Sequence, residues 1–230
     1  MRIFANFGYY LIDKVRFLYI NDSIEKVDID NDVFALGSTT IPVSINLLSW
    51  AFGKYSRGAV KVHTLLDLRG SIPNFILITN GKYHDSNILD ELYFIPNAFY
   101  VMDKAYVDMN ALYNIHSQDS FFVTRAKKNM KYHIIEENFN INELTRLRFD
   151  KKISLSVYKS NKIYPENLRL IGYYDTEKDE IFEFLTNNFD ITALEIANLY
   201  KNRWQIEVFF KWIKQNLTIK HLWEVYRKCC

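Results

Sequence analysis

Four side chains near the end of the chain have types and spacing that could do chemistry together. Tyr200, Arg203, Glu207 and Lys214 stand at relative positions 0, 3, 7 and 14 of an expected helix. At about 100° per residue they fall within an arc of roughly 60°, so they share one helix face. Two interpretations stay open: a solvated face with an i,i+4 ion pair between Arg203 and Glu207, or a functional site.

A second candidate is Asp103, which follows the short apolar run AFYVM and so ends an expected strand. A carboxylate in that position points into the usual ligand crevice of an α/β sheet, although a lone Asp is often only a turn residue or a helix cap. Together, Asp103 and Glu207 could hold divalent cations through oxygen ligands. Two such cations can clamp a phosphodiester during displacement, which requires about three carboxylates. The third is expected in the middle of the first strand.

The bulk composition is that of a globular chain with a full core. Of 230 residues, 49% are apolar and 24% are charged. No apolar run reaches the length of a membrane span, and charge appears too early for a signal peptide. Cys229 and Cys230 are adjacent, and His63 and His84 have no cysteines at ligand spacing, which disfavours a disulfide framework or a zinc site. We therefore expect a cytoplasmic protein with no membrane partner.

The distribution of charge is more informative than the net charge of +2. Residues 125–169 contain eleven Lys or Arg against five Asp or Glu, and residues 201–228 contain seven against two. Basic segments of this kind suit a polyanion, because phosphate neutralisation releases condensed counterions. Solvated protein surfaces also carry such charges, so both interpretations stay open.

Apolar, β-branched runs bounded by turn residues predict strands in the first half of the chain. The runs at 33–41, 60–68 and 72–79 predict an antiparallel meander. Helical and strand patterns then alternate, which predicts parallel pairing, at 84–95, 98–103, 107–118 and 121–126. Asp85 is expected to cap the first of these helices. Residues 1–30 are mixed and end in an acidic loop.

From about residue 128 the pattern changes to that of an antiparallel β region. Its strands are expected at 152–159, 168–175 and 181–188. The longest helical pattern follows at 191–217, with Thr192 or Asp190 as its N-cap.

The stretch YKNRWQIEVFFKWIK has the form Y-x2-R-x3-E-x6-K. It resembles the YREK signature of DDE transposases of the bacterial insertion-sequence-four family. Three longer blocks, 36–87, 99–129 and 185–217, also resemble the catalytic blocks of that family in the right order. The resemblance covers roughly residues 28–222.

The resemblance implies an α/β fold: a ribonuclease H-like mixed sheet flanked by helices, with a β-rich insertion before the last catalytic helix. It implies that Asp103 and Glu207 are the second and third catalytic carboxylates and metal ligands. Tyr200, Arg203 and Lys214 would contact transposon-end DNA. Family members use Mg²⁺ to hydrolyse one strand at the end of the element and to join it to target DNA. The implied partners are transposon-end DNA, target DNA and intact transposase copies.

The chain departs from the family pattern where a catalytic Asp is expected, because it has Gly37 there. Glycine offers no ligand, and neither Asp32 nor Asp67 is an obvious substitute. A milder departure is Lys104-Ala105, where Arg-Gly is usual. We therefore expect Mg²⁺ binding to be weakened or lost and this copy to be catalytically inactive.

The expected organisation is that of a truncated copy. Residues 1–27 would be the remnant of an N-terminal region, 28–127 and 189–222 the catalytic domain, 128–188 the inserted β subdomain and 223–230 a divergent tail. Two other hypotheses stay open. The chain could be a non-catalytic regulator that binds DNA or intact transposase, or a remnant that folds poorly.

Overall fold

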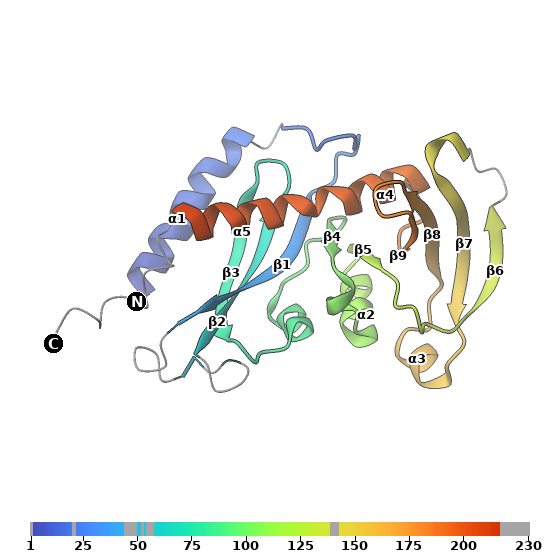
Figure 1. Cartoon of the computed structure of the whole chain (residues 1–230), viewed down its shortest axis with the longest axis horizontal. Coiled ribbons are helices and arrows are strands. Elements are labelled where there is room, and N and C mark those ends of the chain that lie inside the picture. The colour runs from blue at the N-terminus through green and yellow to red at the C-terminus, as the bar shows by residue number, and fades with distance from the viewer. Residues whose placement is uncertain are drawn as a thin grey trace.

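The computed structural model describes residues 2–19, 22–43, 50, 51, 53, 58–138 and 143–216. Over these residues the strands form one nine-stranded sheet in the order β3-β2-β1-β4-β5-β9-β8-β7-β6 (Figure 1). The strands are β1 (Val33–Pro42), β2 (Ala59–Asp67), β3 (Ile72–Asn80), β4 (Phe99–Met102), β5 (Phe121–Arg125), β6 (Tyr132–Asn138), β7 (Leu147–Leu155), β8 (Leu168–Asp175) and β9 (Glu180–Thr186). The helices are α1 (Arg2–Tyr19), η2 (Asp85–Glu91), η3 (Lys104–Tyr106), α2 (Met109–Ser117), η4 (Glu143–Thr145), α3 (Tyr158–Ile163), α4 (Ala193–Asn202) and α5 (Trp204–Asn216).

The first five strands form the mixed part of the sheet. Strand β2 pairs antiparallel with both β1 and β3, whereas β4 is parallel to β1 and β5 is parallel to β4. The antiparallel meander and the parallel strands that follow it are therefore confirmed. This order and these directions are those of a ribonuclease H-like sheet, so the predicted fold class is confirmed.

The last four strands extend the same sheet. They pair antiparallel with one another, and β9 pairs antiparallel with β5. The predicted antiparallel β region is present, but its strands differ from the prediction in detail. Strand β6 was not predicted, and α3 occupies part of the first predicted strand. The division of the chain into separate domains stays a prediction.

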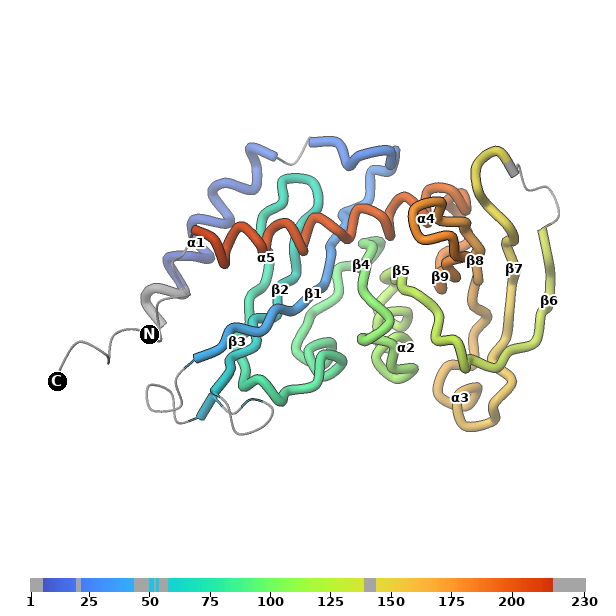
Figure 2. The backbone as a smooth tube through the Cα atoms, viewed as in Figure 1, coloured from blue at the N-terminus to red at the C-terminus, as the bar shows by residue number. Residues whose placement is uncertain are grey.

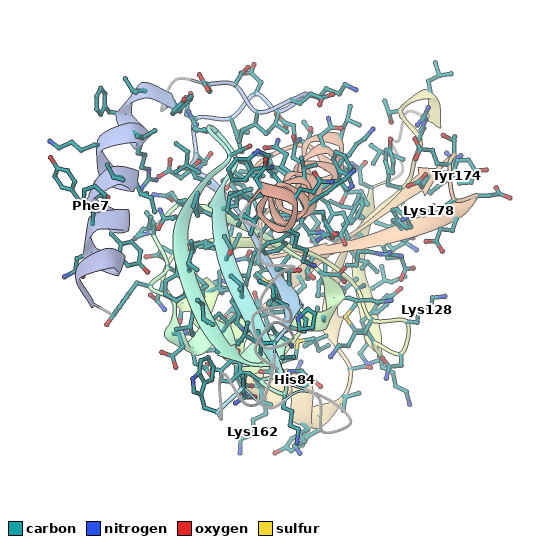
Figure 3. All side chains as sticks on the ribbon, turned by 60° about the vertical axis from the view of Figure 1, so that its left-hand side comes forward. Phe7, His84, Lys128, Lys162, Tyr174 and Lys178 are labelled. Atoms are coloured by element: carbon teal, nitrogen blue, oxygen red, sulfur yellow. The ribbon has the colours of Figure 1, made fainter. Side chains whose placement is uncertain are left out.

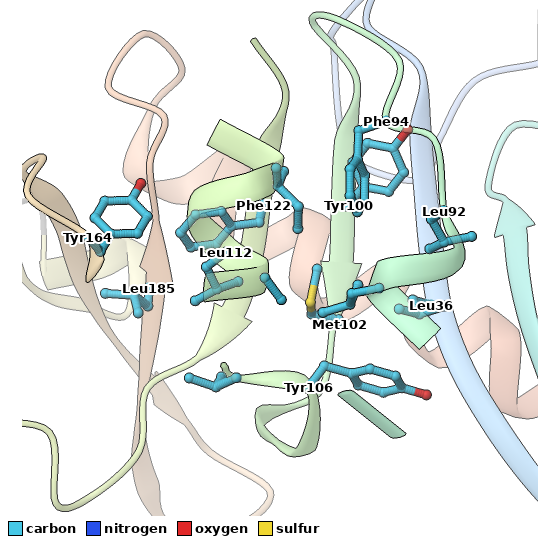
Figure 4. Packing of buried hydrophobic residues seen from close by; sticks show 14 of the residues in the cluster. Leu36, Leu92, Phe94, Tyr100, Met102, Tyr106, Leu112, Phe122, Tyr164 and Leu185 are labelled. Atoms are coloured by element: carbon cyan, nitrogen blue, oxygen red, sulfur yellow. The ribbon is translucent and has the colours of Figure 1, made fainter. Parts of the chain in front are cut away.

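Side chains along β1 and β4 alternate between the two faces of the sheet, as the geometry of a strand requires. On one face, Leu36, Tyr100 and Met102 pack with residues of η2 and α2 (Figure 4). On the other face, Ala35 and Val101 pack in a cluster that includes residues of α4 and α5. Helix α5 crosses this second face over β1, and α1 lies beside β3 (Figure 2). The expected catalytic helix therefore covers one face of the central strands.

Three helices differ from the prediction. Helix α1 was not predicted, and 84–95 forms a 3-10 helix of seven residues instead of an α-helix. The long pattern at 191–217 divides into α4 and α5 at Arg203, where the backbone makes tighter bonds: Arg203 N–H donates to Tyr200 O at 3.2 Å, and Ile206 N–H donates to Arg203 O at 3.2 Å. Of the two predicted N-caps, Thr192 and Asp190, the structure has Thr192 at the start of α4, and its capping box with Glu195 is complete.

Two further predictions concern the tail of the chain and the membrane. The predicted divergent tail at 223–230 lies outside the described residues. No helix among those described has the length and apolar character that a bilayer span requires.

Candidate active site

The parallel pairing of β1 and β4 sets the centre of the candidate site. Leu36 pairs with Met102, so the next positions, Gly37 and Asp103, lie side by side. Asp103 continues the extended backbone of β4 as the residue before η3. Because side chains alternate along a strand, Asp103 lies on the same face as Val101, the face that α5 covers.

Helix α5 packs directly over Gly37. A Cβ atom built on Gly37 would lie 3.0 Å from Ile206 Cδ1, 3.1 Å from Ile206 Cγ2 and 3.2 Å from Phe210 Cε2. Ile206 and Phe210 are themselves buried. A side chain at position 37 would therefore be tightly packed against apolar groups of the helix, which would have to shift by a few tenths of an ångström.

Arg203 connects the two expected catalytic carboxylates. Its Nη2 lies 3.9 Å from Asp103 Oδ2, and its Nη1 donates to Glu207 Oε1 at 3.2 Å. The Arg203 side chain is only 16% exposed, against 41% for Asp103 and 55% for Glu207. The structure therefore brings these three residues together, and the predicted i,i+4 pair between Arg203 and Glu207 is present.

Tyr200 belongs to the same group through its ring. The ring packs on Phe184 with centroids 4.7 Å apart, and the guanidinium carbon of Arg203 lies 5.6 Å from its centroid. Burial raises the pKa of the Tyr200 hydroxyl above its usual value. Tyr200 is therefore neutral at physiological pH and helps to hold Arg203 in place.

Lys214 stands apart from this group on the same helix. Seven residues separate it from Glu207, which is a distance of roughly 10 Å along the axis. Its side chain is half-buried, and it forms no hydrogen bond or ion pair with the part of the chain that the structure describes.

Asp85 does not have the role predicted for it. His84, not Asp85, is the N-cap of η2. The carboxylate of Asp85 instead accepts a hydrogen bond from Ser38 Oγ at 2.6 Å and pairs with Lys61 Nζ at 3.3 Å. Ser38 follows Gly37 on β1, so its side chain points to the opposite face of the sheet, and Asp85 contacts β1 from the face that η2 covers and α5 does not. Sequence reasoning missed this contact because the two residues are 47 positions apart and no periodic pattern relates them.

His63 lies beside Asp85 in the core. It is fully buried, its Nε2 lies 3.0 Å from Thr79 Oγ1, and its Nδ1 lies 3.8 Å from Asp85 Oδ1. Burial lowers the pKa of His63 to about 4, although the Asp85 carboxylate opposes this effect. His63 is therefore a residue of the core.

The lowered pKa of His63 predicts a loss of stability in acid. Below about pH 6.5 the unfolded chain takes up the proton and the folded chain does not, so stability is lost as the pH falls toward 4. Between about pH 7 and about pH 5 we expect His63 to contribute a loss of roughly 2 kcal/mol. Urea unfolding at both pH values should show this loss in the wild type and in the exposed control His133→Gln, but not in His63→Gln. An unchanged pH dependence in His63→Gln would contradict the assignment.

A ribonuclease H-like sheet with one acid at the end of β4 and another on the helix above it is typical of DDE-type domains. The family model described as "Transposase DDE domain" matches residues 26–222, so the chain belongs to this family of transposases. The predicted family is thus confirmed.

Individual relatives agree with this assignment. A probable transposase for insertion sequence element IS5377 of Geobacillus stearothermophilus is 31% identical over 80% of this chain and 48% of its own length. A putative transposase for insertion sequence element IS4SA of Synechocystis is 25% identical over 83% of this chain and 53% of its own length. The chain thus spans about half the length of the curated relatives it matches. Among solved structures, a piggyBac transposase synaptic complex with hairpin DNA aligns with a TM-score of 0.46 and 9% identity, over 90% of this chain and 45% of that one.

Transposases of this family use divalent metal ions. The residues around Gly37 do not fit a divalent metal ion. Within the described ranges, no three His, Cys, Asp or Glu side chains are grouped to hold a metal ion. A side chain at position 37 would meet Ile206 and Phe210 at 3.0–3.2 Å from its Cβ, so these apolar groups lie where a ligand would begin. Thr64 pairs with Gly37 across the strands, and its buried Oγ1 has no hydrogen-bond partner among the described residues. The surroundings of Gly37 therefore contain a polar group that a carboxylate at this position could satisfy.

Proposed function

We propose that this chain is the catalytic domain of an insertion-sequence transposase that binds transposon-end and target DNA but has lost DNA cleavage and strand transfer. The observation that carries the proposal is the position of Gly37, beside Asp103 and beneath α5. With the first carboxylate missing, Asp103 and Glu207 cannot hold two cations in the arrangement that in-line displacement requires. In active members of the family the metal would be Mg²⁺.

DNA binding does not depend on the missing carboxylate. It depends on cations, and Lys214 has an ammonium group that no described residue neutralises. Arg203 and Tyr200, which lie at and near the junction of α4 and α5, would contact the DNA end together with Lys214. The protein would act in the cytoplasm, where the element and its targets are located.

A second candidate function is regulation of intact transposase copies. Two observations favour it, namely the cation of Lys214 and the missing carboxylate at Gly37. A domain that binds element ends without cutting them would compete with intact transposase for those ends. Its partners would then include intact copies of the enzyme.

The test of DNA binding is the salt dependence of the affinity for a fluorescent duplex that carries the element end. We expect Lys214→Gln to weaken binding several-fold and to reduce the slope of log K against log salt by about 1, as for one lost phosphate contact. The control is Lys162→Gln, an exposed lysine (labelled in Figure 3) on α3, a helix that lies at the opposite end of the molecule from the last turn of α5 (Figure 1). Binding that is absent, or that Lys162→Gln weakens as much as Lys214→Gln, would contradict the proposal.

A further inference from the structure

Arg203 has a position that DNA contact alone does not explain, because its guanidinium lies against both remaining carboxylates of the site. We infer that Arg203 is the resident cation of this site and neutralises Asp103 and Glu207, so that the folded chain neither needs nor takes up a divalent metal there. The inference rests on the proposed function only for the identity of Asp103 and Glu207 as the two catalytic carboxylates.

The local structure holds Arg203 in this role. The residue sits at the junction of α4 and α5, where its backbone makes the tighter i,i+3 bonds. Its side chain extends toward Glu207 one turn later and toward Asp103 on the sheet. The Tyr200 ring supports the guanidinium from the side. The guanidinium donates a hydrogen bond to Glu207 through Nη1 while its Nη2 forms an ion pair with Asp103 at 3.9 Å, an arrangement that a lysine ammonium holds with less geometric control.

The energetics favour the guanidinium over a metal ion at this site. Arg203 is largely buried, and a buried cation without a counterion is strongly destabilised. A divalent cation that took the two carboxylates would leave Arg203 in that state and would place a second positive charge beside it. Gly37 offers no third ligand, and the apolar side chains of Ile206 and Phe210 pack closely against it. The loss of the counterions of Arg203, the added positive charge and the lack of a third ligand all make displacement of Arg203 by a metal ion unfavourable.

The experiment uses the chain without DNA and measures its melting temperature with Mg²⁺ and with a chelator, at constant ionic strength. We expect the wild type to melt at the same temperature in both. Arg203→Gln should melt about 2–4 °C lower with the chelator, and Mg²⁺ should restore part of the loss, because the carboxylates are then unpaired. The matched control is Lys201→Gln, an exposed cation near the same junction, which should change neither value. Arg203→Lys should recover part of the stability.

A second readout covers the case in which Arg203→Gln does not fold. Mn²⁺ binding, followed by electron paramagnetic resonance, should be equally weak for the wild type and for Asp103→Asn. A wild type that Mg²⁺ stabilises, or that binds Mn²⁺ clearly more tightly than Asp103→Asn does, would overturn the inference. Neither readout involves DNA, so this failure is distinct from failure of the proposed function, which the Lys214 and Lys162 variants test.

Discussion

Replacement of Arg169 by Met is expected to lower the free energy of unfolding by about 3–5 kcal/mol. Arg169 is buried, with Nε and Nη2 each donating to the Asp150 carboxylate at 2.8 Å and Nη1 donating to Ile191 O at 2.6 Å. Methionine would fill most of the space, but it would leave the buried carboxylate of Asp150 without a counterion. Because Ile191 lies just before α4, the same change should loosen the start of the helix pair that carries Arg203 and Glu207.

Lys152→Met is the matched control for this prediction. Lys152 pairs with Glu136 at 3.3 Å on the adjoining strands, but the two side chains are 34% and 69% exposed. Exposed pairs contribute less than about 1 kcal/mol. Urea unfolding of both variants checks the prediction. An Arg169→Met variant as stable as Lys152→Met would show that the buried pair does not fasten β7 and β8 to the helices.

The strands of the first half could be predicted because the residue pattern of each strand indicates which of its faces are buried. The runs that became β1, β2 and β3 are β-branched, apolar and bounded by turns such as those around Gly70 and Gly81. A strand buried on both faces has to be apolar along its length, as in β4, where all four residues are buried. The pattern therefore reflects a constraint that does not depend on the neighbouring elements.

Elements that depend on neighbours were missed. Helix α1 was missed although its apolar residues recur at helical spacing, and several of them, such as Phe7 and Phe17, stay exposed. The break at Arg203 has no proline or glycine to mark it. Nearby, Asn202 Nδ2 donates to Glu25 O at 2.9 Å, a contact 177 residues apart. Tertiary contacts of this kind cannot be derived from local pattern.

The candidate site likewise has residues that the sequence predicted and contacts that it did not. Sequence motifs indicated Asp103, Glu207 and Arg203, and the structure places them in contact. The contact of Ile206 and Phe210 with Gly37 depends on the rotation of α5 and on its height above the sheet, which residue spacing does not fix. The hydrogen bond between Ser38 and Asp85 likewise depends on how η2 folds back onto β1.

Restoration of the carboxylate at position 37 is expected to have the largest effect on activity. Gly37→Asp should increase Mg²⁺-dependent nicking by a thousandfold or more, which is the scale expected for groups that stabilise transition-state charge. The new side chain has to be accommodated, because its Cβ would lie 3.0 Å from Ile206 Cδ1. Ile206→Val removes that methyl group, so the double variant Gly37→Asp with Ile206→Val should nick at least as fast as Gly37→Asp alone.

The control for this prediction is Gly37→Asn. Asparagine matches aspartate in size and meets the same neighbours, but it has no charge and is a weaker metal ligand. Nicking that returned with Asn as fully as with Asp would show that packing, and not a carboxylate, is what the Gly37 chain lacks.

Nicking of a duplex that carries the inverted-repeat end of the element tests the central claim most directly. Because this chain spans about half the length of its curated relatives, wild type and Gly37→Asp should both be assayed in the full-length background. We predict no Mg²⁺-dependent nicking above background by the Gly37 protein and clear nicking by the Gly37→Asp protein. Equal rates for the two proteins, whether both nick or neither does, would contradict the claim that the missing carboxylate at Gly37 accounts for the loss of activity.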